Sequence, residues 1–133
     1  MLTGGRWNQK GIPLIYTAEN RALATLEYVV HVPLSIMPRN LSIAFYEIPD
    51  DIVPEEILID DLPKKWRAYP SPPKLAELGS EWALATRSLL LRVPSAIVLS
   101  ESNVLINPKH PEITRITISH VEKYAMDKRL LRE

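Results

Sequence analysis

Three side chains that could bind or transform an anionic ligand lie within the first 27 residues. Arg6 follows two glycines in the segment GGRWNQKG, and a guanidinium can bind phosphate through two parallel hydrogen bonds. Tyr16 ends a short apolar run, where its ring could stack against a flat ligand. Glu27 borders the apolar face of a helical pattern, where a carboxylate is either solvated or held for chemistry. The cluster predicts a site for an anionic ligand.

Each candidate residue also has a purely structural interpretation. Arg6 could be a surface arginine packed on Trp7, and Tyr16 could be a half-buried tyrosine of a strand. Ser95 follows Pro94 in a position typical of a turn, and no residue near it in the sequence activates it as a nucleophile. Taken singly, these residues leave both interpretations open.

The sequence lacks the residue patterns of most common enzyme classes. The chain has no cysteine, which excludes disulfides, thiolate catalysis and iron–sulfur clusters. Its three histidines have no metal-ligand spacing, so we predict no metal site. Its four glycines match neither a phosphate-binding P-loop nor a dinucleotide-binding pattern, and no GxSxG segment is present.

Length and charge indicate an ordinary globular domain. The 133 residues suffice for one domain with a proper core, and 46% of them are hydrophobic. Acidic and basic residues balance at 16 each, so no overall field attracts nucleic acid or an anionic membrane. The N-terminus lacks the apolar run of a signal peptide. We therefore predict a single cytoplasmic domain over residues 1–133, with no direct contact to nucleic acid or membrane.

The hydrophobic pattern predicts two main helices among five or six short strands. The first helix covers residues 17–31 with Thr17 as its N-cap, and the second covers 74–90. The segment between them is acidic and then rich in proline, and we expect a loop there with a helical turn at 54–59. Strands are expected at residues 13–17, 41–49, 95–100, 103–107 and 115–126, the last as one strand or a pair. This order predicts an α+β fold with a small mixed or antiparallel sheet.

Helical spacing predicts which side of each helix is buried. The expected apolar face of the first helix consists of Ala22, Leu23, Leu26, Val29 and Val30. That of the second consists of Leu75, Leu78, Trp82, Ala85 and Leu89. Asn103 and Asn107 are expected to fix turns around a short strand, and His110 is expected to be a structural loop residue.

Two sequence blocks resemble a known family. Residues 4–27, GGRWNQKGIPLIYTAENRALATLE, resemble the opening motif of the RES-domain toxins, the toxic components of type II toxin–antitoxin pairs. Residues 78–113, LGSEWALATRSLLLRVPSAIVLSESNVLINPKHPEI, resemble the second signature of this family, and the two blocks stand in the family's order. The arginine, glutamate and serine that give the family its name correspond here to Arg6, Glu27 and Ser95, with Tyr16 as the accompanying tyrosine.

The resemblance implies a fold related to ADP-ribosyltransferases and a reaction that consumes NAD+ as a substrate, without a cofactor. Enzymes of this kind break the bond between nicotinamide and ribose. Water or phosphate accepts the ADP-ribosyl group in some members, and a protein in others. The resemblance also implies a partner antitoxin with an Xre-like DNA-binding domain that covers the site, in a complex whose oligomeric state stays open.

The chemistry of this reaction assigns roles to the matched residues. Arg6 would bind the pyrophosphate, and Tyr16 would stack on the nicotinamide or its ribose. Glu27 would stabilise positive charge on the ribose or orient its hydroxyl groups. Ser95 would donate a hydrogen bond to the nicotinamide or a phosphate. Pyridinium is already a good leaving group, so a single carboxylate suffices.

One departure from the family pattern leaves alternatives open. Family members usually carry a first strand ahead of the GGRWN motif, whereas Gly4 here follows Met1 by three residues. We expect that strand to be missing or truncated, with an exposed sheet edge as the result. The sequence therefore supports three hypotheses: an NAD+ glycohydrolase or phosphorylase, an ADP-ribosyltransferase that modifies a protein, and an inactive member that binds the antitoxin.

Overall fold

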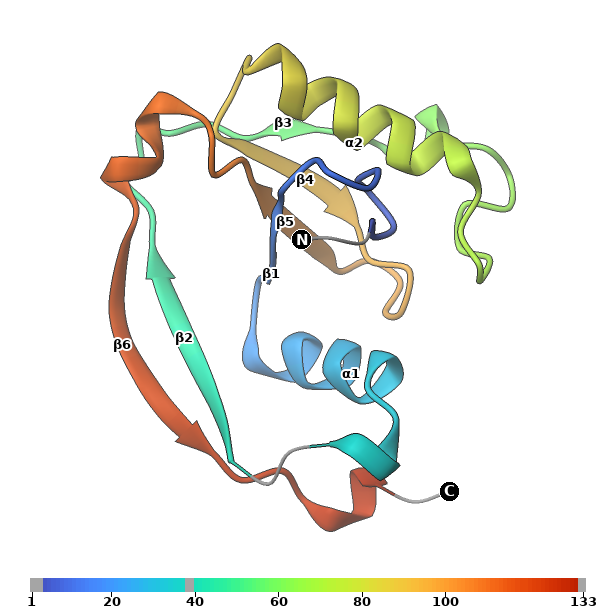
Figure 1. The fold of residues 1–133 in the computed structure, drawn as a ribbon, viewed down its shortest axis with the longest axis vertical. Coiled ribbons are helices and arrows are strands. Elements are labelled where there is room, and N and C mark those ends of the chain that lie inside the picture. The colour runs from blue at the N-terminus through green and yellow to red at the C-terminus, as the bar shows by residue number, and fades with distance from the viewer. Residues whose placement is uncertain (1–3, 38–39, 132–133) are drawn as a thin grey trace.

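The computed structural model describes residues 4–37 and 40–131, which form an α+β fold (Figure 1). The α+β class predicted from the sequence is confirmed. None of the helices in the described part of the chain is long and apolar enough to cross a membrane. The helices and strands are β1 (Ile15–Ala18), α1 (Arg21–His31), β2 (Leu41–Glu47), β3 (Glu55–Glu56), α2 (Pro73–Ala85), β4 (Leu90–Pro94), β5 (Ser102–Ile106) and β6 (Thr117–Tyr124).

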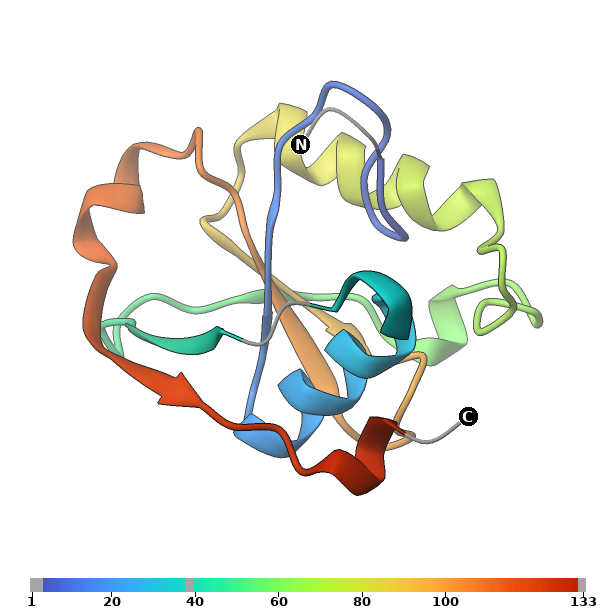
Figure 2. The same cartoon turned by 60° about the horizontal axis from the view of Figure 1, so that its bottom comes forward.

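The strands form two separate sheets. A four-stranded sheet has the order β1-β5-β4-β3, in which β3 and β4 are parallel and the other neighbours antiparallel. Strands β2 and β6 pair with each other as an antiparallel ribbon, with an irregularity between Phe45 and Tyr46. Figures 1 and 2 show α2 beside the four-stranded sheet, and Figure 1 shows α1 below that sheet and beside the lower part of the ribbon. The sheet system is therefore mixed.

The core lies between α2, the four-stranded sheet and the N-terminal loop. Trp82 is only 1% exposed, which confirms its predicted place in the core. A second, smaller cluster of Leu89, Leu90 and Ile106 lies among partly buried residues that include Ile15. The main cluster consists of Trp7, Leu14, Trp66, Leu75, Trp82, Ala83, Leu91, Val93 and Leu105.

Helix α1 begins later than predicted. Asn20, not Thr17, is its N-cap: the Asn20 side-chain oxygen accepts a hydrogen bond from the Leu23 backbone N–H at 2.8 Å. Thr17 belongs to β1, and its hydroxyl donates to the carbonyl oxygen of Val104 at 2.7 Å. The strand therefore continues through the position at which a helix start was predicted.

The predicted apolar face of α1 is only partly buried. Leu23 is fully buried, but Leu26 and Val30 are 37% and 58% exposed, and Ala22 is exposed as well. The helix contacts β1, and polar side chains connect it to the ribbon: Arg21 pairs with Glu122, and Thr25 hydrogen-bonds with Tyr124. The prediction of one continuous buried stripe is therefore wrong.

Helix α2 is shorter than the predicted helix of residues 74–90. It ends at Ala85 because Thr86 adopts the left-handed conformation, with φ of 56°, and Ala85 is exposed. Residues 90–94 form β4 instead and pair with β5. The run of leucines fits a buried strand as well as a helix, and tertiary pairing decides between them.

The strand predicted at residues 95–100 is absent, and turns occupy this segment. The Ser95 hydroxyl accepts hydrogen bonds from the backbone N–H groups of Ile97 and Val98, each at 3.1 Å, which bends the chain. The helical turn predicted at 54–59 lies later, because β3 occupies Glu55–Glu56 and a 3-10 turn follows at Ile59–Asp61.

The predictions around β5 and β6 are largely confirmed. Residues 103–107 correspond to β5, and 115–126 to the single strand β6. Asn107 fixes a turn by accepting from the Lys109 N–H at 3.1 Å. His110 accepts from the Glu112 N–H at 3.0 Å. Asn103 is the exception, because it lies within β5 and fixes no turn.

Helix α2 supports the loop that carries Arg6. A Cβ atom on Gly79 would lie 1.7 Å from the backbone oxygen of Trp7, so only glycine permits this approach. Next to it, the Ser80 hydroxyl accepts from the Gln9 backbone N–H at 2.8 Å. The position of the N-terminal loop therefore depends on two adjacent small residues of α2.

Gly79→Ala is expected to lower the free energy of unfolding by about 1–3 kcal/mol, because the new methyl group must displace the Trp7 backbone. The loss should appear despite the gain of about 1 kcal/mol that alanine brings to a helix interior. Urea unfolding of the variant beside exposed Glu77→Ala in the same helix measures this. A Gly79→Ala protein as stable as the wild type would contradict the close packing of the loop on α2.

Candidate active site

A cavity of about 460 Å³ brings three of the four predicted site residues together. It lies between the N-terminal loop, α1 and the turn after β4. Its polar and charged lining consists of Arg6, Tyr16, Glu27, His31 and Asn103. In the described part of the chain, no three acidic or histidine side chains gather as a metal site would require.

The Glu27 carboxylate is held at both oxygens. Asn103 donates from its side-chain nitrogen to Oε1 at 2.7 Å, and the Ser95 hydroxyl donates to Oε2 at 3.3 Å. The carboxylate projects from α1, whereas its two partners come from β5 and the end of β4. Three elements thus fix one acidic group at the cavity wall.

Ser95 acts on Glu27 and does not line the cavity. Its side chain is 1% exposed, and its oxygen already accepts from the Ile97 and Val98 N–H groups. Two incoming donors leave the hydroxyl hydrogen free to point at the Glu27 carboxylate. Direct contact between Ser95 and a ligand in the cavity does not fit this geometry.

The environment of Glu27 makes it easier to protonate than an exposed glutamate. Burial raises its pKa, while the hydrogen bonds from Asn103 and Ser95 and the nearby His31 act in the opposite direction. The hydrogen bonds stabilise the ionised form in a half-buried place. A carboxylate with these properties can stabilise an adjacent positive charge.

The Tyr16 hydroxyl is committed to the N-terminal loop. It accepts from the Trp7 N–H at 3.0 Å and donates to the side-chain oxygen of Asn8. A Cβ on Gly5 would lie 2.7 Å from this hydroxyl, which explains a glycine at that position. Burial raises the pKa of Tyr16 to about 12, so the phenol is neutral at physiological pH. The ring of Tyr16, not its hydroxyl, is therefore the part available to a ligand.

The Arg6 guanidinium is hydrogen-bonded to the backbone through one nitrogen and also lines the cavity. Its Nη1 donates to the backbone oxygen of Trp66 at 2.7 Å, and the side chain is half-buried at the cavity wall. Partial burial lowers the pKa of Arg6 from its ordinary value, against an opposing effect of Tyr16. Among residues 4–37 and 40–131, no carboxylate forms an ion pair with Arg6. Its positive charge is therefore available to an anionic ligand.

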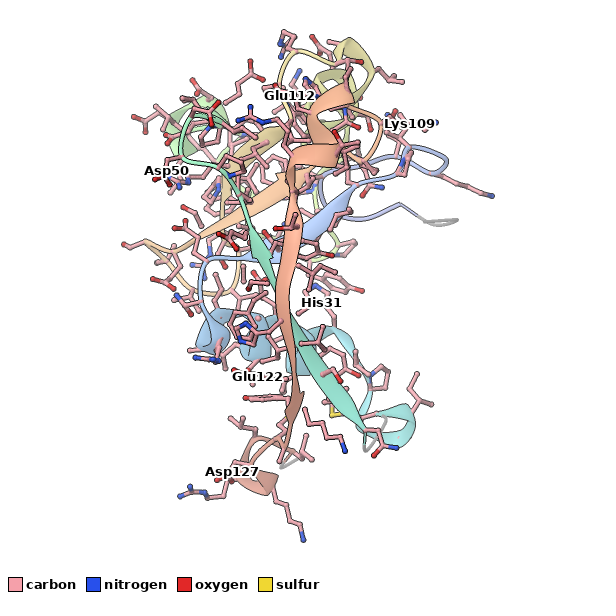
Figure 3. All side chains as sticks on the ribbon, turned by 90° about the vertical axis from the view of Figure 1, so that its left-hand side faces the viewer. His31, Asp50, Lys109, Glu112, Glu122 and Asp127 are labelled. Atoms are coloured by element: carbon pink, nitrogen blue, oxygen red, sulfur yellow. The ribbon has the colours of Figure 1, made fainter. Side chains whose placement is uncertain are left out.

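A second cavity, of about 530 Å³, lies between α1 and the ribbon. Its arginine is already paired: Arg21 donates to both oxygens of Glu122 at 3.0 and 3.2 Å, and its guanidinium lies 4.6 Å from the centre of the Phe45 ring. Figure 3 shows the ribbon with Glu122 crossing in front of α1. An unpaired cation beside a held carboxylate distinguishes the first cavity as the candidate active site.

The sequence interpretation missed two groups that build the site. Asn103 donates a hydrogen bond to Glu27. The side-chain oxygen of Asn8 accepts from the Tyr16 hydroxyl and, at 3.0 Å, from the Gly5 backbone N–H. For Asn103 the sequence offered one signal: asparagine is uncommon inside an apolar strand segment, and a buried amide there needs hydrogen-bond partners. Pattern alone does not tell what those partners are.

Comparison with known proteins identifies the family. The RES domain model matches residues 1–127. The chain is 41% identical to a protein named Prs ADP-ribosylating toxin from Sphingobium sp. (strain YBL2), over 99% of this chain and 83% of the relative. It is 37% identical to a protein named Toxin Res from Yersinia enterocolitica, over 96% of this chain and 84% of the relative. The family resemblance and the ADP-ribosyltransferase-like fold class are thereby confirmed, and the chain belongs to the RES domain family.

Proposed function

We propose that this protein cleaves the bond between nicotinamide and ribose in NAD+, as a glycohydrolase or a phosphorylase. The observation that carries the proposal is the Glu27 carboxylate, held at both oxygens on the wall of a cavity that Arg6 and Tyr16 share. NAD+ combines an anionic pyrophosphate with a flat cationic ring and a ribose. The cavity offers a cation, an aromatic face and a carboxylate, one for each of these parts.

The reaction needs stabilisation of one developing charge. As the bond between C1′ and the nicotinamide nitrogen breaks, its electron pair passes to the ring, which leaves as neutral nicotinamide. The ribose then carries positive charge shared between C1′ and the ring oxygen. A water or phosphate oxygen forms the new bond at C1′, and with water a proton is released. Glu27 stabilises the positively charged ribose electrostatically.

The remaining residues bind and orient the substrate. Arg6 binds the pyrophosphate through the guanidinium nitrogens that Trp66 does not use. Tyr16 offers its ring to the nicotinamide or the ribose. Ser95 orients Glu27 through the hydrogen bond at 3.3 Å, in place of a direct contact with NAD+.

The test is release of nicotinamide from NAD+ by the purified protein, with and without added phosphate. Release that requires phosphate indicates a phosphorylase, and release without it a glycohydrolase. Wild-type protein that is folded but releases no nicotinamide under either condition would contradict this proposal.

A second candidate function is supported by the name of a relative. The Sphingobium protein that is 41% identical to this chain is named an ADP-ribosylating toxin. The same cavity chemistry serves this function, because only the acceptor at C1′ differs. Labelled NAD+ distinguishes the two: label that becomes bound to a protein indicates a transferase, whereas label recovered only as free ADP-ribose or its phosphate indicates NAD+ degradation.

We also propose that the protein is a toxin with an antitoxin partner of Xre-like type. Support comes from relatives named Toxin Res at 37% and 36% identity. Expression of this chain alone is expected to arrest growth and to deplete NAD+ in the cells. Normal growth at a good yield of folded protein would instead favour the hypothesis of an inactive member.

Activity is expected to fall at acidic pH as Glu27 becomes protonated. Burial raises the pKa of Glu27, so this loss begins at a higher pH than for an exposed glutamate. Below that pKa the rate should fall about tenfold per pH unit, because only the ionised carboxylate stabilises the ribose cation. A profile of kcat against pH measures it, and a rate that stays constant down to pH 4 would contradict the role of an ionised Glu27.

A further inference from the structure

The side-chain amide of Asn103 donates two hydrogen bonds beside the candidate active site. Both hydrogens of its amide nitrogen have acceptors: Glu27 Oε1 at 2.7 Å and the backbone oxygen of Thr17 at 3.1 Å. The residue is 9% exposed, so water does not easily replace these partners. One planar group thus connects the carboxylate of α1 to the backbone of β1.

We propose that Asn103 is a positioning residue that fixes the Glu27 carboxylate relative to the four-stranded sheet. This inference rests on the proposed function, in which Glu27 stabilises the ribose cation. Nothing in the family comparison assigns a role to Asn103.

The sheet gives Asn103 a rigid base. It lies in β5, between Ala18 of β1 and Val93 of β4, and is paired with both through antiparallel ladders. Helix α1, by contrast, contacts this part of the molecule along one side only and leaves Leu26 and Val30 exposed. The carboxylate therefore takes its position from the sheet more than from its own helix.

The two donors to Glu27 differ in strength. The contact from Asn103 is 2.7 Å long, whereas the contact from Ser95 is 3.3 Å long. Shorter contacts to an ionised acceptor are the stronger ones. Without Asn103 the carboxylate retains the weaker partner and is free to rotate about its side-chain bonds.

Loss of Asn103 also changes the proton affinity of Glu27. The other titratable and charged groups that line the cavity are Arg6, Tyr16 and His31, and an Asn103 substitution changes none of them chemically. Removal of a hydrogen bond to the charged form disfavours that form. The pKa of Glu27 should therefore rise above its value in the wild type.

The first test is a carbon-13 NMR titration of glutamate carboxyl groups, with the Glu27 signal assigned by its absence in Glu27→Gln. In Asn103→Ala the midpoint of Glu27 should move up by about one pH unit. The matched control is Asn107→Ala: this asparagine is 2% exposed, follows the same strand and donates to the Ala83 carbonyl oxygen at 2.9 Å, away from Glu27. The control should leave the Glu27 midpoint unchanged.

The second test is kinetic. In Asn103→Ala, kcat for NAD+ should fall about 10- to 100-fold, because a small misplacement of a catalytic group has an effect of this size. KM should change little, and the acidic limb of the pH profile should move upward with the NMR midpoint. If the alanine variant does not fold, Asn103→Asp keeps the shape of the side chain, and its second carboxylate should raise the Glu27 midpoint further.

A Glu27 midpoint in a folded Asn103 variant equal to that of the wild type would overturn the positioning role. So would unchanged kcat with a shifted KM, because that result assigns Asn103 to substrate binding. The NMR titration needs no turnover, so it also separates the two proposals. If the wild type consumes no NAD+ but the midpoint shifts, the proposed function fails and the hydrogen-bond effect of Asn103 on Glu27 stands.

Discussion

Replacement of Glu27 by glutamine is expected to reduce kcat for NAD+ cleavage by about a thousandfold, with KM nearly unchanged. Glutamine has the shape of glutamate but no charge, and the charge is what stabilises the ribose cation. Because this cation exists only in the transition state, the loss appears in kcat and not in substrate binding. Release of nicotinamide at saturating NAD+ measures the effect.

The fold should tolerate this substitution. A carboxyl whose pKa is raised in the folded state contributes stability below its unfolded pKa and loses it as the pH rises through the folded pKa. Above the folded pKa the wild type has lost this contribution, whereas a permanently neutral glutamine retains it. Glu27→Gln should therefore stay folded at pH 7 in urea unfolding, although its amide nitrogen cannot accept the hydrogen bond that one of the two Glu27 oxygens accepts.

The same substitution at a glutamate outside the cavity is the matched control. Glu77 is exposed on α2, away from the cavity, so Glu77→Gln should leave kcat within about twofold of the wild type. A folded Glu27→Gln protein with the full rate would contradict the mechanism. It would leave membership of the RES domain family untouched, because that rests on the match over residues 1–127.

The parts of the fold that follow from local pattern were predictable. The turn chemistry of Asn107 and His110 depends on residues only two positions away, and both predictions are confirmed. Trp82 was placed in the core by helical spacing, which is also a local property. The grouping of Arg6 with Glu27 follows from their closeness in the sequence together with the family resemblance, since no spacing rule connects a loop to a helix across 21 positions.

The parts that failed depend on tertiary contacts. Strand β4 exists because residues 90–94 pair with β5, and nothing local in a run of leucines distinguishes that outcome from a helix. The Asn103 hydrogen bond to Glu27 spans 76 positions. Ser95 is buried behind Glu27, where two backbone N–H groups donate to its hydroxyl oxygen. The sequence pattern alone does not specify these contacts between residues of different elements.

Arg6 differs from Glu27 in what it binds. The pyrophosphate of NAD+ keeps its charge from ground state to transition state, so an arginine that binds it stabilises both equally. Nη1 is already engaged with the Trp66 carbonyl oxygen at 2.7 Å, which fixes the orientation of the guanidinium plane. The guanidinium group is therefore oriented before the substrate binds, and the single ammonium group of a lysine cannot reproduce its planar set of donors.

Arg6→Ala is accordingly expected to raise KM for NAD+ about a hundredfold and to leave kcat nearly unchanged, which corresponds to about 2.7 kcal/mol of lost binding. The KM of Arg6→Lys should lie between those of the wild type and Arg6→Ala, because lysine keeps the positive charge but cannot form two parallel hydrogen bonds to a phosphate. The matched control is Arg67→Ala: this exposed arginine also donates to a backbone oxygen, that of Ala96 at 3.1 Å, but does not line the cavity. Initial rates over a range of NAD+ concentrations give both constants. If Arg6→Ala lowered kcat and left KM alone, Arg6 would act on the reacting ribose and not on the pyrophosphate.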